Sequence, residues 1–434
     1  SAPDVIFNAA ADVVIGTGDT KSTIVLANVN TATETGSLVE LNDVCIHGNR
    51  AEIGAGIAST NTFIGSPLKI MSNVATGGGG GLATKDTSLQ LQTDTTDITF
   101  KCNIAGSRKD IPNSKECIED VYDDESVDSS MPVFAFAQMK YDGLGVKSIL
   151  NTACKDSTVC KNGGVGGGIL MILSKVAKKT MTISGGSTIP GIQYNRADGG
   201  GGGIAVLSSE GADVDQNFEI KSGVQIKKNV ALHGAGMLLL GLQKAAMLGD
   251  ITEPASSKIV IEHNKALNRG WDVEGNMVHN GKGGGVAVID CQDVRLSQID
   301  IKYNFALSVG GGLHVENSHI KPEGDGQKSF VEENVAHQGG GMNLEKQSSF
   351  KWSPTNLFAI RKNQALIGGG VSIRDSILDM DGDSSSVTIQ PDETIVHFVL
   401  ESTDTDATST PPPTTTAAIT CTVADGGVND ECEA

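Results

Sequence analysis

The sequence predicts an all-β fold, a parallel β-helix (solenoid) of about ten or more rungs. Three observations carry this prediction. One short pattern recurs nine times with a period near thirty residues, which is typical of one structural unit stacked many times. Glycine is abundant (54 residues) whereas aromatic residues make up 4% of the chain, so a narrow core of Ile, Val, Leu and Ala layers is favoured over a wide one. Short alternating runs, and no segment of helical period, indicate strands.

Each repeat places an apolar residue three positions before an Asn and an Ala two positions after it. A glycine step follows, and the next residue is apolar in all nine copies, from Ile57 to Val371. We expect the Asn to bend the chain between two strands, because Asn tolerates left-handed backbone conformation. The repeated asparagines are Asn49, Asn73, Asn103, Asn195, Asn229, Asn264, Asn304, Asn334 and Asn363.

The other repeated residues fit the same picture. Equivalent Asn side chains on successive rungs, about 4.8 Å apart, can form a hydrogen-bond ladder. The alanine suits a tight inward position, and the glycines allow positive φ and close packing of rungs. Three short strands can be read in each rung, and examples of the three kinds are Phe218–Ile220, Val224–Ile226 and Val286–Val288. Nine rungs predict a rod of about 45 Å.

The repeat also predicts the domain organisation. A β-helix occupies residues 1–400, with 1–40 as an N-terminal cap or irregular first rung. Insertions at 106–166, which contains cysteines, and at 267–282 both fall in the turn after the alanine, where a solenoid tolerates extra length. A Thr/Ser/Pro-rich linker is expected at 401–420 and a disulfide-clipped tail at 421–434. The chain opens at Ser1, which suggests a processed chain or an excised fragment.

Charge and cysteine content limit the partners and the location expected for the protein. A formal charge of −19 disfavours nucleic acid as a partner, and no apolar run is long enough to span a membrane. Eight cysteines, an even number, favour an oxidising, extracellular or cell-surface location. Cys45 and Cys291 are interpreted as buried thiols within repeat strands. No Cys/His spacing predicts zinc, so no metal and no cofactor are expected. The disulfide candidates are Cys102, Cys117, Cys154, Cys160, Cys421 and Cys432, and the pairing of the first four stays open.

The repeat resembles that of the chlamydial polymorphic outer membrane proteins over roughly residues 44–375. The resemblance rests on apolar-x-x-Asn-x-Ala followed by a glycine step, as in Ile301–Ala306 with Gly310–Leu313. Two features depart from that family. Only Phe100 supplies the Phe that the family prefers before the Asn, and Gly stands where the family has Ala as the third small residue. The resemblance implies a right-handed β-helix with adhesive or structural roles.

Candidate chemistry is sparse. Asp290 with Asp293 and Arg295, or Asp272 with Glu274, are the carboxylate groups considered for a polysaccharide lyase or hydrolase. Neither group recurs on neighbouring rungs. The acidic run at 379–383 lacks the Gly and Glu that an EF-hand-like calcium loop needs. No nucleophile signature or phosphate loop is visible. The sequence therefore predicts no catalytic residues.

The sequence favours a non-enzymatic extracellular structural or adhesive protein, a rigid rod that associates end to end into a filament or surface appendage. The alternative is a carbohydrate-active β-helix enzyme. Expected partners are copies of the chain, other extracellular matrix or surface proteins, and glycans. No Asn-x-Ser/Thr sequon occurs, so glycosylation is expected only in the tail. The O-glycosylation candidates are Thr408, Ser409, Thr410, Pro411, Pro412, Pro413, Thr414, Thr415 and Thr416.

Overall fold

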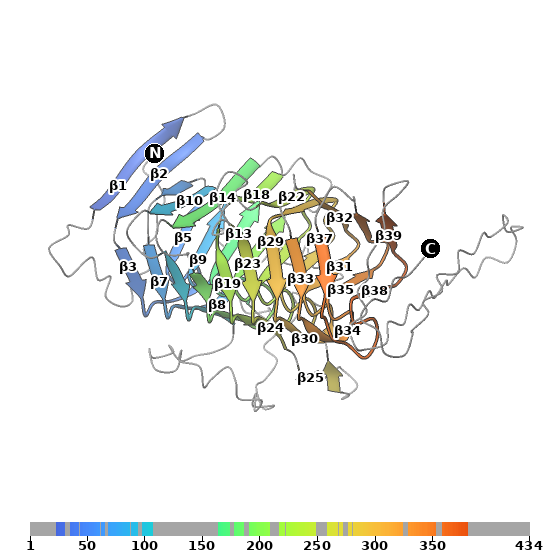
Figure 1. The fold of residues 1–434 in the computed structure, drawn as a ribbon. Helices are drawn as coiled ribbons and strands as arrows, with labels where there is room; N and C mark the ends of the chain where they lie inside the picture. The colour runs from blue at the N-terminus through green and yellow to red at the C-terminus, as the bar shows by residue number, and fades with distance from the viewer. Residues whose placement is uncertain are drawn as a thin grey trace, which may run out of the picture.

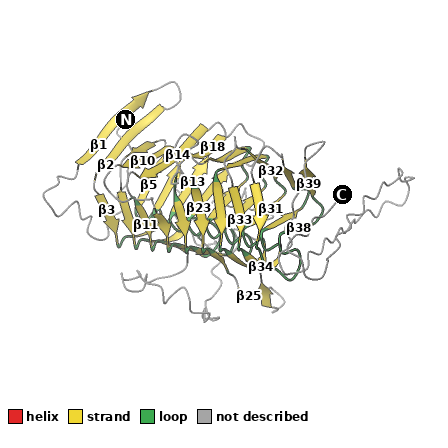
Figure 2. Cartoon of the chain, viewed as in Figure 1, coloured by secondary structure: helices red, strands yellow, loops and turns green. Residues whose placement is uncertain are grey.

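The described part of the chain is all-β, with parallel strands in four stacked sheets and no helix (Figures 1 and 2). This arrangement is consistent with a β-solenoid. The computed structural model describes residues 23–30, 35–42, 44–60, 62–65, 68–86, 88–93, 98–106, 164–173, 178–185, 191–208, 217–221, 223–248, 258–267, 269–271, 277–279, 281–323, 329–352 and 358–380.

We number the four sheets S1 to S4 in the order in which a repeat enters them. S1 contains β1 (Thr23–Asn30), β2 (Thr35–Asn42), β6 (Thr62–Gly65), β10 (Ser88–Thr93), β14 (Lys178–Gly185), β18 (Asn217–Lys221), β22 (Lys244–Leu248), β28 (Asp293–Ser297), β32 (His319–Pro322), β36 (Ser349–Trp352) and β39 (Ile377–Met380). S2 contains β3 (Val44–His47), β7 (Leu68–Met71), β11 (Thr99–Lys101), β15 (Gly191–Gln193), β19 (Gln225–Lys227), β23 (Ile259–Glu262), β29 (Ile299–Lys302), β33 (Ser329–Glu332) and β37 (Phe358–Arg361).

S3 follows the asparagines and S4 follows the glycine steps. S3 contains β4 (Arg50–Ile53), β8 (Val74–Gly78), β12 (Ile104–Ala105), β16 (Arg196–Ala197), β20 (Val230–Ala231), β24 (Lys265–Ala266), β30 (Phe305–Val309) and β34 (Val335–Gln338). S4 contains β5 (Ile57–Thr60), β9 (Leu82–Lys85), β13 (Ile169–Leu173), β17 (Ile204–Ser208), β21 (Met237–Leu240), β27 (Val286–Ile289), β31 (Leu313–Glu316), β35 (Met342–Glu345) and β38 (Val371–Ile373). A separate antiparallel pair, β25 (Arg269–Trp271) and β26 (Met277–His279), lies in the second insertion.

The first eight repeats each contribute four strands rather than the three expected, and the Asn363 repeat has only isolated bridges at the S3 position. The additional strand belongs to S3 and is only two residues long in β12, β16, β20 and β24. A pair of residues is too short to show the alternation by which strands are recognised in a sequence. What defines it as a strand is its parallel pairing with the equivalent residues of neighbouring repeats, as where Ile104 lies opposite Arg196. The backbone N–H of Arg196 donates to Asn103 O at 2.9 Å on one side of this pair, and that of Asp198 donates to Ala105 O at 3.0 Å on the other.

The main hydrophobic core is lined by S1, S2 and S4. It contains the apolar residue before the Asn in eight repeats and two alternate residues of most S4 strands, for example Leu313 and Val315 of β31. The Ala after the Asn forms a separate buried column in S3, which includes Ala105, Ala197 and Ala306. Small side chains suit this column because the glycine steps pack closely beside it.

The nine repeated asparagines form a continuous, buried hydrogen-bond ladder between S2 and S3. From Asn49 to Asn334, each Nδ2 donates to the Oδ1 of the next Asn along the stack at 3.0–3.1 Å, so that eight bonds join the nine residues. The same Oδ1 also accepts from the backbone N–H of the preceding Asn, as Asn229 does from Asn195 at 2.9 Å. From Asn73 onward, Nδ2 makes a second bond to a carbonyl of S2, as Asn229 does to Ile192 at 2.9 Å.

The left-handed residue at this bend is the one before the Asn, not the Asn itself. Positive φ values occur at Ser72, Cys102, Tyr194, Lys228, His263, Tyr303, Glu333 and Lys362, and at Gly48 in the first repeat. Left-handed backbone costs a non-glycine residue about 1–2 kcal/mol. The structure shows why the Asn has another role: its side chain is committed to the bonds between repeats.

Both sequence insertions interrupt S3 between the alanine and the glycine step. After the first insertion, the chain rejoins the stack at Val165, whose backbone forms a parallel β-bridge with Gly78. After the second insertion, the chain rejoins the stack at Lys282. The backbone of Lys282 forms parallel β-bridges with His233 on one side and Val309 on the other. The stack therefore continues in register across both interruptions.

A shorter ladder supports the corner between S4 and S1. The backbone N–H groups of Cys291, Ser318 and Ser348 donate to the Oγ atoms of Ser318, Ser348 and Ser376, at 2.8, 3.2 and 3.1 Å. Cys291 is a buried free thiol at this corner, between β27 and β28 rather than within a strand. Burial raises the pKa of this thiol to about 12, so it stays protonated and unreactive.

Candidate functional site

Two of the residues singled out from the sequence, Asp290 and Arg295, contact different partners. Asp290 is half-buried in the bend after β27 and accepts a hydrogen bond from Asn317 Nδ2 at 2.7 Å. Arg295 pairs with Glu323, with 3.5 Å between Nη1 and Oε2. Asp379 is exposed on β39. Asp272, Glu274, Asp381 and Asp383 lie outside the described residues.

Most disulfide candidates also lie outside the described residues: Cys117, Cys154, Cys160, Cys421 and Cys432. Cys102 is described, buried and disulfide-bonded. The structure does not describe the side chain of its partner, so the pairing stays open. The O-glycosylation candidates from Thr408 to Thr416 fall outside the described ranges as well.

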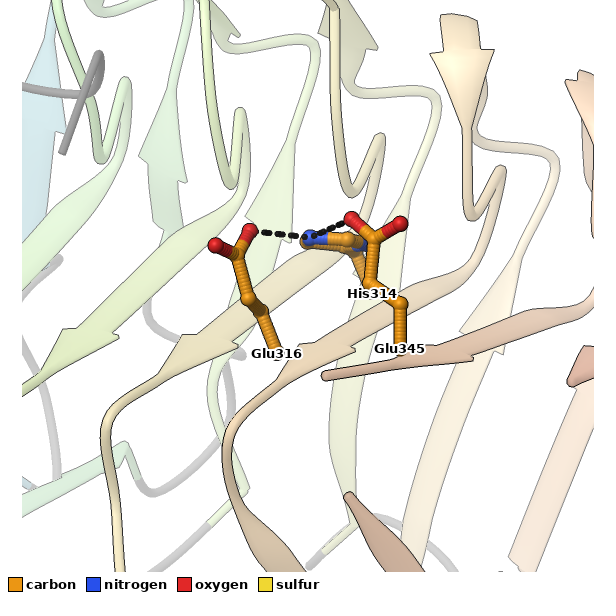
Figure 3. Close-up of side chains that lie close together, drawn as sticks. All are labelled: His314, Glu316 and Glu345. Atoms are coloured by element: carbon orange, nitrogen blue, oxygen red, sulfur yellow. Dashed lines mark hydrogen bonds and ion pairs between the residues drawn. The ribbon is translucent and has the colours of Figure 1, made fainter. Parts of the chain in front are cut away.

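A cluster of charged and polar side chains that the sequence did not predict lies on the outer face of S4. It is formed by His314 and Glu316 of β31, Asn343 and Glu345 of β35, and Lys282 at the return from the second insertion. The inward neighbours on these strands, such as Val315, lie in the main core. The alternation of a strand therefore places His314, Glu316 and Glu345 together on the opposite face (Figure 3).

Register between repeats brings these side chains side by side. Glu316 is directly opposite Glu345, and His314 is opposite Asn343. One repeat earlier, the same two positions of S4 are Ala287 and Ile289. These apolar residues belong to a second buried cluster on the outer face of S4. The polar cluster thus begins where this apolar column ends.

Two nitrogen atoms contact the same pair of carboxylate oxygens. His314 Nε2 lies 3.3 Å from Glu316 Oε2 and 3.5 Å from Glu345 Oε1 (Figure 3). Lys282 Nζ lies 3.1 Å from that Glu316 oxygen and 2.9 Å from that Glu345 oxygen. Lys346 Nζ pairs with the other oxygen of Glu316. Both carboxylates therefore contact His314 and Lys282, and Glu316 also contacts Lys346.

The charges in the cluster stabilise its ionised carboxylates. Burial alone raises the pKa of Glu316, but the His314 hydrogen bond and the charge of Lys282 outweigh it, so the net pKa is lowered. The pKa of Glu345 is also lowered, because His314 and Lys282 outweigh burial. Burial lowers the pKa of His314 and outweighs the hydrogen bond to Glu316, which raises it. Lys282 shows the reverse balance: its pKa is raised because the two carboxylates outweigh burial.

Buried polar atoms without a hydrogen-bond partner border this cluster. His233 is fully buried, both of its ring nitrogens lack a partner, and it bridges Lys282 in the next repeat. Asn343 Nδ2 donates to His314 Nδ1 at 3.2 Å, whereas Asn343 Oδ1 has no partner. Most buried polar atoms in proteins are satisfied, so orphaned atoms concentrated at one place mark it as a functional candidate.

The signal that could have revealed the cluster is the alignment of the repeats with one another. Directly after the glycine step, two successive repeats read Leu313-His-Val-Glu316 and Met342-Asn-Leu-Glu345. The four preceding described S4 strands, from β13 to β27, carry apolar or small residues at the same outward positions, as in Met237-Leu-Leu-Leu240. A search for ligands a few residues apart fails here because these residues lie one repeat apart.

We predict that replacing His233 by Val makes the free energy of unfolding less dependent on pH on the acid side. Burial, followed by the charges of Lys282 and His314, lowers the His233 pKa to about 3, against 6.5 in an unfolded chain. Between these values only the unfolded state binds the proton, so the contribution of His233 to stability is intact above pH 6.5 and is lost as the pH falls toward 3. Each pH unit in this window costs about 1.4 kcal/mol.

Chemical denaturation of both proteins between pH 3 and 7.5 measures this effect. Val is a suitable replacement because Val165 and Val309 stand at the equivalent β-bridge position of other repeats. His319, which is largely exposed on β32, provides the control: His319→Val should retain the wild-type profile. Equal slopes for His233→Val and wild type between pH 3 and 6.5 would show that His233 is not the titrating group.

Comparison with known proteins identifies no relative. No protein-family model, curated protein sequence or solved structure matches the chain. In the part of the chain that the structure describes, no helix is long and apolar enough to cross a membrane.

Proposed function

We propose that this chain is a non-enzymatic extracellular structural or adhesive protein, whose solenoid is a right-handed parallel β-helix acting as a rigid rod. The observation that carries the proposal is the Asn ladder. It runs through all nine repeats, from Asn49 to Asn363, and ties each repeat to the next by buried bonds. The repeated Asn, Ala and Gly residues are committed to the interior, so the repeat itself serves support rather than chemistry.

End-to-end association of rods extends this proposal. At the C-terminal end of the described stack, Leu366, Ile367 and Ile377 are 77%, 39% and 63% exposed. Strands β37, β38 and β39 are the last described members of their sheets. Exposed apolar side chains beside terminal strands favour addition of a further strand layer from another copy.

Electron microscopy of the purified chain over a concentration series tests the rod and its assembly. We expect elongated particles that join end to end as the concentration rises. The double variant Leu366→Lys/Ile377→Lys should remain as single rods, because the added charges oppose contact between ends. Val335→Lys, which alters an exposed apolar residue one repeat earlier, is the control and should still assemble. Globular particles, or rods that stay single at every concentration, would contradict the proposal.

An extracellular or cell-surface location belongs to the same proposal. Its support is the disulfide-bonded state of Cys102, since disulfides persist mainly in oxidising compartments. Non-reducing peptide mapping of the native protein tests it, and Cys102 recovered only as a free thiol would count against it. The resemblance to polymorphic outer membrane proteins points the same way, toward adhesion or assembly with other surface proteins and glycans.

A carbohydrate-active enzyme is the second candidate, because Glu316 and Glu345 converge on the surface of S4. Glycoside hydrolysis needs one carboxyl group that is protonated and can donate to the leaving group. Here both pKa values are lowered and both side chains are 15% exposed, which favours a stabilising role. Release of reducing ends or unsaturated products from a polysaccharide panel, lost in Glu316→Gln, would favour the enzyme instead.

A further inference from the structure

The spacing of three side-chain atoms in the S4 cluster matches one face of a metal coordination sphere. His314 Nε2, Glu316 Oε2 and Glu345 Oε1 all lie within 4.8 Å of one another. The two nitrogen-to-oxygen distances are 3.3 and 3.5 Å. Ligands at 2.0–2.1 Å from a tetrahedral ion are separated by about 3.4 Å. Both nitrogen-to-oxygen distances therefore already match the spacing of ligands on one ion, and the two oxygens lie within 4.8 Å of each other.

We propose that His314, Glu316 and Glu345 bind a divalent transition-metal ion such as Zn²⁺, and that Lys282 occupies the site when no ion is bound. One imidazole and two carboxylates suit Zn²⁺ and related ions, whereas Ca²⁺ takes six to eight oxygen ligands. The site goes beyond the proposed rod function and does not depend on it.

Lys282 stands where a fourth ligand would lie. Its Nζ contacts the same two oxygens as His314 Nε2, at 3.1 and 2.9 Å. A divalent ion at the centre of these atoms would repel the ammonium group and replace its charge. The Lys282 side chain is 23% exposed, so it can move its charged end into solvent. The displaced position would then be open to water, as in zinc sites with three protein ligands.

Asn343 supplies the independent observation that points to a ligand. Its Nδ2 now donates to His314 Nδ1, which requires the ring proton to be on Nε2. Metal binding requires a free lone pair on Nε2 and the proton on Nδ1. Rotation of the Asn343 amide brings Oδ1, which is buried and has no partner, to accept that proton. The amide can therefore support both the metal-free and the metal-bound forms of His314.

Titration of the full chain with Zn²⁺ by isothermal calorimetry tests the site, and Co²⁺ absorption tests its geometry. We expect one ion per chain and an intense tetrahedral Co²⁺ spectrum. His314→Gln and Glu345→Gln should abolish both signals. Asn343→Ala should weaken binding by about 10- to 100-fold, the usual effect of losing a group that orients a ligand.

Lys282→Met gives a result that loss of folding cannot imitate. Removing the competing ammonium should tighten Zn²⁺ binding at least about tenfold. Zn²⁺ should also raise the Tm of this variant more than that of wild type, because the ion replaces the charge that the carboxylates have lost. Lys258→Met is the matched control: it removes a lysine that pairs with Asp300 at 3.0 Å, and should leave the affinity unchanged.

Three results would overturn the proposal: absence of Zn²⁺ binding in both wild type and Lys282→Met, binding that persists in His314→Gln and Glu345→Gln, or equal affinities of Lys282→Met and wild type. Rod formation in the microscope is a separate measurement. A failed titration with intact rods rejects the metal site alone, whereas specific binding by globular particles rejects the rod alone.

Discussion

Replacing Asn229 by Ala is expected to lower the free energy of unfolding by about 3–6 kcal/mol. The substitution removes the Oδ1 that accepts from both the N–H and the Nδ2 of Asn195. It also removes the Nδ2 that donates to Ile192 O and to Asn264 Oδ1. Several buried groups are left without partners, because water does not reach the ladder. Equilibrium denaturation in urea measures the loss.

Asn49→Ala is the matched control because it changes the same residue type at the end of the ladder. Asn49 Oδ1 has no partner in the folded protein. Its Nδ2 bond to Asn73 is the only side-chain hydrogen bond shown for Asn49 in the described residues. We expect a cost of about 1 kcal/mol. If Asn229→Ala were no more destabilising than Asn49→Ala, the ladder could not be the source of stability between repeats.

Gly285→Ala is expected to destabilise the protein by about 3 kcal/mol or to displace neighbouring repeats. A Cβ at this position would lie 2.6 Å from Gly312 O and 2.7 Å from Ile301 Cγ2. It would also approach Asn304 Nδ2 at 3.0 Å, so the clash reaches the Asn ladder. The backbone of the next repeat cannot move away from the added Cβ without separating the two repeats. Thermal and urea denaturation, with far-UV circular dichroism to check the β content, measure the effect.

Gly370→Ala tests the same substitution where no described repeat follows. The nearest atom to a Cβ at Gly370 is Ile360 Cγ2, at 3.9 Å, which is ordinary contact. The change should be neutral or should stabilise by up to about 1 kcal/mol, since Ala restricts the unfolded chain. Equal losses for Gly285→Ala and Gly370→Ala would contradict the view that close packing between repeats requires glycine.

Much of the fold follows from repetition. Identical residues one period apart must stack when the units stack, so the Asn pattern is enough to anticipate a ladder such as that between Asn195 and Asn229. The local geometry was less accessible. The two-residue S3 strands, such as β16, carry no readable alternation, and the left-handed residue at the bend varies from Ser72 to Lys362. Nothing in these varied side chains signals positive φ.

The S4 cluster shows why the candidate site could not be anticipated in the same way. His314 and Glu316 are two residues apart, but Glu345 reaches them through the pairing of β31 with β35. Lys282 comes from S3, at the return from an insertion, and contacts carboxylates that follow in two later repeats. The distances between these atoms depend on the register and on the spacing of sheets, which no local pattern encodes.

The sequence by itself determined the repeating unit: which residues stack, where the chain can be interrupted, and that the core is narrow. Those features depend on chemistry that is local and repeated nine times, so each copy reinforces the inference from the others. Only the tertiary structure decided that a repeat has four strands. It also decided that Glu316 and Glu345 both contact His314 Nε2 and Lys282 Nζ. Such contacts occur once, between residues far apart in the chain, and they form only when stacking has brought their repeats together.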